Sequence, residues 1–348
     1  MTLKRVLLGS TALLGAGAML LTAQEASAQV EVSVGGFARW AVAAGNFNDL
    51  TGNNNRRSLY FRNDTEVFVT FRGKDDATGT EYGAKVELEA DTNALFNADE
   101  TWLWIKGSWG ELRLGDEDGG ADMFKVGGAS VAAGTGGIDG MGEVAPVPVW
   151  PRRSGDATKI VYISPSMGGL SVALSYTPDS GQGGNATFPA TNNGSIENWI
   201  EGGVRFQGSF GGADIKASVI GGVGKYEAGT AFPLLGDDFW MLGAGVQVGF
   251  GGISVAAGYF AERDDQQLAG DRNIWNVGVG GSVGPVDLSL TFAYVDNQTG
   301  VEPRNLVFSA TYGLFPGMAL QGDIAIWDRD VGANDSGVSG VLRLHIAG

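Results

Sequence analysis

Three acidic side chains stand close together in the chain, at a spacing that could supply oxygen ligands to a hard cation. They are Asp116, Asp118 and Asp122. Ca²⁺ binds carboxylate and carbonyl oxygens, and short aspartate-rich loops can provide them. The match is weak, because Gly120 stands where the EF-hand pattern needs an acidic or amide side chain. These acids therefore indicate solvated loop residues in preference to a metal site, and no cofactor is expected beyond a weakly supported structural Ca²⁺.

Other patterns that carry chemistry are incomplete. The chain has no cysteine and a single histidine, His345, so no His-dependent catalytic triad or His-rich metal site can be built. Gly224-Lys225 fails as a phosphate-binding loop, since Val219 takes the first glycine position of that pattern. The net charge of −16 argues against nucleic acid, whose phosphates need Lys and Arg. We predict neither an enzyme nor a nucleic-acid-binding protein.

The acids continue into a long segment without strand periodicity, residues 117–156. Its acidic side chains include Asp118, Asp122, Asp139 and Glu143. About forty residues is far beyond a normal connection between elements, and connections of that length are usually functional or disordered. The segment is therefore our first candidate for a functional element.

Alternation of apolar and polar residues with period 2 runs through the rest of the chain after its first 28 residues. In residues 286–294, for example, apolar side chains alternate with Asp287, Ser289 and Thr291. Successive side chains of a strand point to opposite faces, so each segment has one apolar and one polar face. The segments are about 9–14 residues long, which suits a tilted membrane crossing. We predict sixteen strands of this kind.

The connections between these segments are of two kinds, and aromatic residues gather near both. Short glycine-rich turns, such as Gly211-Gly212 and Gly251-Gly252, alternate with longer polar loops. Trp109 and Phe210 lie beside short turns, whereas Trp40 and Trp199 lie toward long loops. Alternating short turns and long loops, with aromatic girdles at both ends, are typical of an outer-membrane β-barrel in contact with lipid. The mean hydropathy of +0.01 agrees, because lipid-facing and water-facing residues average out.

The first residues have the layout of a secretory signal peptide. Lys4 and Arg5 precede an apolar stretch that ends near Leu21, and Ala26-Ser27-Ala28 follows. A basic region, an apolar region and a small-x-small site in this order predict cleavage. We expect residues 1–28 to be removed and residues 29–348 to form the barrel in the bacterial outer membrane.

Basic residues fall on the polar face of the predicted strands. Period-2 spacing directs them into the barrel, and a barrel of sixteen strands encloses an aqueous channel. The predicted wall bases are Arg39, Arg62, Arg72, Lys85, Lys106, Arg113, Arg205, Lys216 and Arg343.

The chain resembles the general porins of Gram-negative outer membranes over essentially its whole length after the first 28 residues. The most specific stretches are EVFVTFRG at 66–73, GAKVELEAD at 83–91, DETWLWI at 99–105 and GELRLGD at 110–116. The resemblance implies a sixteen-stranded barrel, a homotrimer, and a third loop that folds inward to narrow the pore. It also implies a terminal aromatic residue, whereas this chain ends in Ile346-Ala347-Gly348.

These observations predict a channel for passive diffusion of ions and small hydrophilic solutes. Acids of segment 117–156 facing the wall bases would create a transverse field and a mild cation preference. Two alternatives stay open: a substrate-specific channel with the same barrel, and a secreted β-rich adhesin. A solenoid adhesin should show a fixed repeat period, and these segments vary in length.

Overall fold

The computed structural model describes residues 30–46, 57–91, 98–140, 147–184, 193–227, 238–264, 271–330 and 335–348. The predicted signal peptide and Glu143 lie outside these residues, so their predictions stay untested.

Sixteen strands account for most of the described residues. Their alternating apolar and polar side chains suit a sheet with one lipid-facing and one water-facing side. The strands are β1 (Glu31–Gly45), β2 (Leu59–Lys74), β3 (Glu81–Glu89), β4 (Ala98–Gly107), β5 (Gly110–Asp116), β6 (Thr158–Ile163), β7 (Leu170–Asp179), β8 (Ile196–Phe210), β9 (Ala213–Tyr226), β10 (Asp238–Phe250), β11 (Ile253–Asp264), β12 (Arg272–Val283), β13 (Val286–Asn297), β14 (Arg304–Phe315), β15 (Met318–Asp328) and β16 (Ser336–Ala347).

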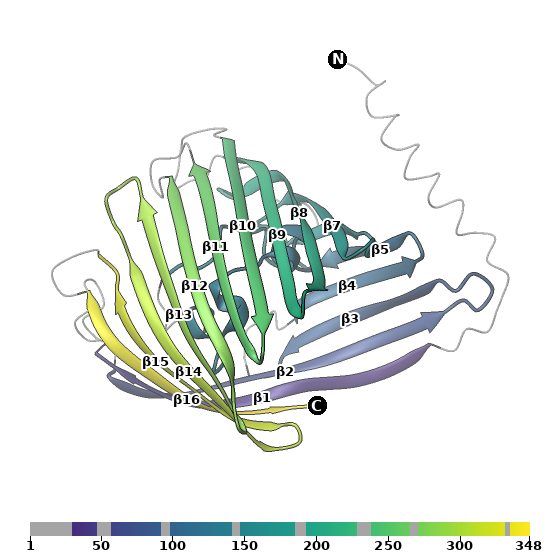
Figure 1. Ribbon diagram of the computed structural model, residues 1–348. Coiled ribbons are helices and arrows are strands. Elements are labelled where there is room, and N and C mark those ends of the chain that lie inside the picture. The colour runs from purple at the N-terminus through teal and green to yellow at the C-terminus, as the bar shows by residue number, and fades with distance from the viewer. Residues whose placement is uncertain are drawn as a thin grey trace.

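Each strand pairs antiparallel with its neighbours in sequence, and β1 also pairs with β16 to close the barrel (Figure 1). The closing register sets Phe37 opposite Ala347, and Gly36 and Gly348 exchange two backbone hydrogen bonds. Closure leaves no sheet edge with unpaired N–H and C=O groups, which lipid could not satisfy. The predicted sixteen-stranded antiparallel barrel is confirmed.

The two faces of the wall differ in chemistry. On β13, Leu290 is 43% exposed, whereas Ser289 and Thr291 are 4% and 1% exposed. The same alternation recurs around the barrel, with Val, Leu, Ile and Phe on the outside. Exposed apolar side chains over a whole outer wall fit a hydrocarbon surrounding, and the polar inner face fits water and hydrogen-bonding protein.

The strand ends are joined by short turns at one end of the barrel. Between β8 and β9, Gly211 and Gly212 have φ of 60° and 82°. Two consecutive residues with positive φ make the tight turn whose twist matches paired strands, and glycine adopts it without strain. The connections at the other end are longer, as predicted.

The longest described connection is the third one at that end, and we call residues 117–157 loop 3. It contains the short helix α2 (Gly120–Phe124) and the 3₁₀ turns η2 (Gly128–Val131) and η3 (Gly137–Asp139). Among the residues that the structure describes, no helix combines the length and apolar character needed to cross a membrane.

The aromatic bands are present with one exception. Trp109, Phe210, Trp40 and Trp240 are between 42% and 80% exposed on the outside. Trp199 is 1% exposed and points inward, against the prediction. Trp199 shares the inner face with Glu201, which is also 1% exposed, so the alternation of β8 itself turns Trp199 inward despite its place near a long connection.

Candidate functional site

Loop 3 runs along the inner, polar face of the second half of the barrel (Figure 1). Helix α2 packs against β7, β8 and β9, η2 against β10 to β13, and η3 against β13 and β14. The described part of loop 3 therefore contacts more than half of the circumference, and the inner face of β1 to β5 is left on the opposite side.

Polar side chains on successive strands hold the backbone of loop 3. Ser175 of β7 accepts a hydrogen bond from the Gly120 N–H at 3.0 Å, and Thr291 of β13 accepts one from Ile138 at 3.1 Å. A backbone without regular secondary structure needs such partners when it is buried.

Further along the loop the same arrangement continues on β13, β14 and β15. Ser289 accepts from the Ala133 N–H and Thr311 accepts from the Gly134 N–H, both at 2.8 Å. Asp323 accepts from both the backbone and the hydroxyl of Thr135. These attachments fix the course of loop 3 across the lumen wall.

Two of the predicted loop acids form a pair at the start of α2. Asp122 is 7% exposed and makes ion pairs with Lys125 and Arg153, both from loop 3 itself. Burial opposes ionisation of Asp122, but these two bases and a hydrogen bond from Asp118 lower its pKa. Burial and the Asp122 carboxylate raise the pKa of Asp118 to about 7. Asp118 therefore holds the proton of the pair.

Asp139 is exposed on η3 and accepts a hydrogen bond from Trp150 Nε1 at 2.6 Å. Loss of hydration around its carboxyl raises the pKa of Asp139, although the Trp150 hydrogen bond and the charges of Lys125 and Arg153 oppose the rise. Its carboxylate is thus fixed in direction by the returning limb of loop 3.

Two acids of the Ca²⁺ ligand set considered in the sequence have protein partners in the structure. Asp116 is held by the Thr158 hydroxyl and the Gly184 N–H, and Asp122 is held by two bases. These contacts engage Asp116 and Asp122, and the weak prediction of a Ca²⁺ site at Asp116, Asp118 and Asp122 stays a prediction.

The predicted wall bases of β1 to β5 point inward, and four of them meet a carboxylate of the same wall that the sequence did not pair with them. Arg39 pairs with Asp64 at 2.9 Å and Lys85 pairs with Glu87. Lys106 lies 3.9 Å from Glu111. Their positive charge is partly neutralised locally, which weakens the expected field between loop acids and wall bases.

Arg113 makes the most enclosed of these ion pairs. It contacts Glu111 and Glu117, each at 2.6 Å, and Glu117 is 5% exposed. Because Glu117 begins loop 3, this contact connects the loop to the wall of β5.

Inward-facing aromatic rings support several wall bases, which sequence reasoning did not identify. Arg39 lies 3.6 Å from the ring centre of Phe37, and Arg113 lies 4.4 Å from that of Trp102. Arg72 lies 5.8 Å from Trp104. The available signal was a ring at a polar position of the alternation, because an aromatic residue there must enter the lumen.

The remaining predicted bases are also on the inner face. Arg62 lies opposite the inward Ala41 on β1, and Arg343 donates to Gln321 at 2.9 Å. Arg205 donates to the Met123 carbonyl of loop 3 at 3.0 Å, and Lys216 lines a cavity beside Gln207.

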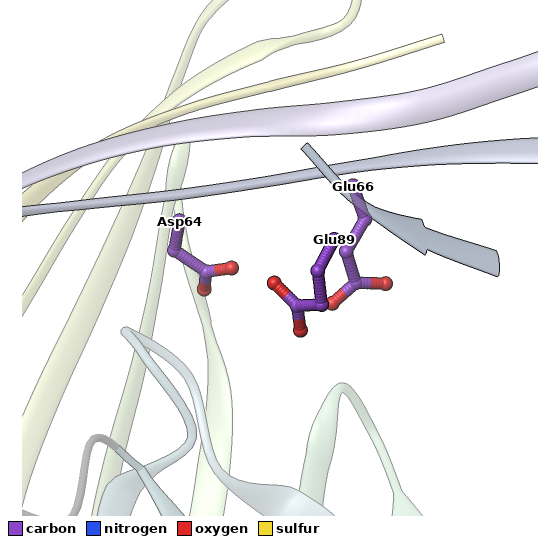
Figure 2. A group of neighbouring side chains, drawn as sticks. All are labelled: Asp64, Glu66 and Glu89. Carbon is purple, nitrogen blue, oxygen red and sulfur yellow. The ribbon is translucent and has the colours of Figure 1, made fainter. Parts of the chain in front are cut away.

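Carboxylates also gather close to one another on this wall, in two groups of three. Figure 2 shows Asp64 and Glu66 of β2 and Glu89 of β3 turned toward one another. Glu100, Asp118 and Asp156 form a second group where β4 faces loop 3. The two groups lie toward the strand ends that lead to the longer connections.

The lumen beside this wall is hollow. A cavity of about 410 Å³ is bounded by β2 to β5, including Arg72, Lys85, Trp104 and Arg113. A second of about 600 Å³ lies between the η2–η3 stretch and the inner faces of β10 to β16, with Gln247, Thr311 and Gln321 in its lining. Both linings are mainly polar, as a water-filled passage requires.

Solved structures with the same architecture are porins, at low sequence identity. An anion-selective porin from Comamonas acidovorans aligns over 92% of this chain and 100% of its own, with 18% identity and a TM-score of 0.68. A loop-deletion mutant of the Vibrio cholerae outer-membrane protein OmpT covers 92% and 99%, at 14% identity and 0.66. A mutant of Rh. blastica porin covers 91% and 100%, at 12% identity and 0.62. No curated protein sequence matches the chain.

The family comparison agrees with the architecture and the polar lumen. The model of the Gram-negative porins matches residues 10–330, which is most of the chain. Proteins of this family and fold are channels, and their place is the outer membrane. The chain thus belongs to the Gram-negative porin family and is an outer-membrane channel for passive diffusion.

Proposed function

We propose that loop 3 forms the narrowest part of the channel and that solutes pass between it and the inner face of β16 and β1 to β5. The single observation that supports this is the attachment of loop 3 to the opposite wall, from Ser175 on β7 to Asp323 on β15. A loop held on one side of the lumen reduces the bore on the other side. The cavity beside Arg72 and Trp104 lies on that free side.

The channel we infer prefers cations mildly. Arg39, Lys85, Lys106 and Arg113 of the free wall each lie beside a carboxylate. Glu66 and Glu89 converge on Asp64, and among the described residues neither of these two glutamates has an ion pair. A low-dielectric wall focuses the field of such groups and concentrates counter-ions. The Comamonas acidovorans porin is described as anion-selective, so we expect this chain to differ from it in the sign of its selectivity.

We also propose cleavage after Ala28 and assembly as a homotrimer. The cleavage proposal rests on the basic, apolar and small-residue order at the start of the chain. The trimer rests on the resemblance to general porins, and a closed ring of three barrels would bury part of each outer wall. Mass measurement of the protein purified from outer membranes tests both, and a monomer in mild detergent would contradict the trimer.

Single-channel recording in planar bilayers tests the role of loop 3. The native protein is compared with a variant in which residues 126–149 are replaced by a short glycine-serine connection. The expected result is a wider channel, seen as higher conductance and entry of larger neutral polymers. Heat-modifiable migration on gels shows whether the variant barrel is folded. Unchanged conductance in a folded variant would mean that loop 3 does not form the constriction.

A further inference from the structure

The inner faces of β10, β11 and β12 carry glycine where loop 3 passes. The positions are Gly245, Gly258, Gly278 and Gly280. A Cβ atom on Gly245 would overlap the Val126 carbonyl, and one on Gly280 would overlap the Val131 carbonyl. The loop backbone therefore lies directly on the strand backbone, closer than any side chain would allow.

Glycine lines this contact on the loop side as well as on the strand side. A Cβ atom on Gly278 would collide with the Gly128 carbonyl, and one on Gly128 would collide with the backbone of Val277. Gly258 faces the Cα of Gly127. Glycine against glycine brings two backbones to their minimum separation, and at this place it lets loop 3 lie as far from the opposite wall as the barrel permits.

Asn276 fastens the loop among these glycines. Its side chain is 1% exposed, accepts a hydrogen bond from the Gly128 N–H at 2.6 Å and donates one to the Val149 carbonyl at 2.7 Å. Gly128 lies on the outgoing limb of loop 3 and Val149 on the returning limb. One amide side chain thus holds both limbs, because its oxygen accepts from one limb and its NH₂ group donates to the other.

We propose that Gly245, Gly258, Gly278 and Gly280, together with Asn276, set the bore of the channel; we call this set the glycine seat. This inference rests on the proposed function of loop 3 as the constriction. The seat determines how far loop 3 stands from β1 to β5, so it determines the size limit for solutes. These residues are positioning residues, since they act on solutes through loop 3.

The absence of side chains at the glycines of the seat lets loop 3 lie against the wall, and any larger residue there would displace the loop. Protein interiors are close-packed, so an added methyl group displaces its neighbour. The strand backbone of the barrel is fixed by hydrogen bonds on both sides, whereas loop 3 is held mainly by side chains. The loop therefore moves, away from the strand backbone and toward the channel.

Paired alanine substitutions test the seat in the full-length trimeric protein. Gly245→Ala and Gly278→Ala should lower the single-channel conductance and the size limit for neutral polymers. Gly313→Ala is the matched control, because Gly313 lies on the inner face of β14 and a Cβ there would meet nothing within 4 Å. The control should keep the native conductance. Seat variants that fold and match the control would overturn the inference.

Replacing Asn276 should act in the opposite direction. Asn276→Ala leaves the Gly128 N–H and the Val149 carbonyl without their partner, so loop 3 is held less firmly and current fluctuations should increase. Asn276→Gln keeps both functional groups and should restore part of the steadiness. If deletion of residues 126–149 widens the channel while the seat variants do nothing, the seat fails and the proposed function stands. If that deletion has no effect, the proposed function itself fails.

Discussion

Asp118 is a loop acid whose charge depends on pH near neutrality. Its neighbour Asp122 is ionised and compensated by Lys125 and Arg153. Burial and the neighbouring Asp122 carboxylate both disfavour a charge on Asp118, so it stays protonated until its raised pKa of about 7 is passed. Ionisation above this pH adds one negative charge to the lumen.

We predict that Asp118→Asn changes ion selectivity only at high pH. At pH 5.5 the native Asp118 is neutral, as is Asn, so the two proteins should have equal reversal potentials in a salt gradient. At pH 8.5 the native protein carries an additional negative charge and should prefer cations more than the variant. A difference already present at pH 5.5 would contradict this assignment.

Arg113 and Arg72 both face the lumen but should respond differently to substitution. Glu117 is 5% exposed and relies on Arg113, so Arg113→Gln leaves a buried carboxylate without its charged partner. We expect a loss of roughly 1–3 kcal/mol of stability, seen as a lower temperature of barrel unfolding on gels. Arg72→Gln should leave that temperature unchanged and raise cation preference. Equal unfolding temperatures for the two variants would exclude this role of Arg113.

At the scale of single residues, the sequence could place side chains on a face but could not find their partners. Period 2 directs Arg39 and Lys85 inward, because alternation is a local property of a strand. Their pairing with Asp64 and Glu87 depends on the register and on side-chain conformation. The pairing of Asp122 with Arg153 depends on the folding of loop 3, which no periodicity describes.

At the scale of elements, loop 3 is closed at its base by one lysine. Lys159 is the second residue of β6, is 3% exposed, and donates to the carbonyls of Glu117 and Gly155. These carbonyls belong to the first and the last turn of the loop. Lys159 thus links the two ends of loop 3 through hydrogen bonds to their backbone.

We predict that Lys159→Met loosens loop 3 without preventing barrel formation. Two buried carbonyls lose their charged donor, which costs more than loss of an exposed contact. More frequent spontaneous current steps should appear in single-channel records. Lys216→Met is the control, since Lys216 also faces the lumen but no hydrogen bond connects it to the described part of loop 3. Equal noise in both variants would refute the role of Lys159.

The strands were predictable and the course of loop 3 was not, for different physical reasons. Strand periodicity is repeated along every segment, so sixteen segments could be recognised one at a time. Trp199 shows the limit, because its place near a long connection suggested the outer aromatic band, whereas the alternation that it shares with Glu201 turns it inward. The glycine seat needs β10, β11 and β12 beside loop 3, and only the closed barrel brings them together.

At the scale of the whole molecule, charge is sorted along the barrel. Glu89 and Glu100 lie near the strand ends that lead to longer connections, and Glu66 of β2 lies opposite Glu89. Arg72 and Lys106 lie near the ends joined by short turns. Among the described residues of this wall, the mouth with the longer loops is therefore the more acidic one. An ion that enters from the long-loop end meets this acidic mouth before the constriction, and an ion that travels the other way meets it afterwards.

This distribution predicts a cation preference that weakens as salt increases. The field of lumen carboxylates extends over a screening length of about 8 Å at physiological ionic strength and about 3 Å at 1 M. Reversal potentials should therefore show clear cation preference in dilute KCl and almost none in concentrated KCl. Glu66→Gln combined with Glu89→Gln should reduce the preference in dilute salt, because two of the three converging carboxylates are lost. Glu302→Gln, outside the strands and remote in sequence, is the control and should behave as the native protein does. Anion preference in dilute salt, or equal behaviour of the double variant and the control, would show that other charges govern selectivity.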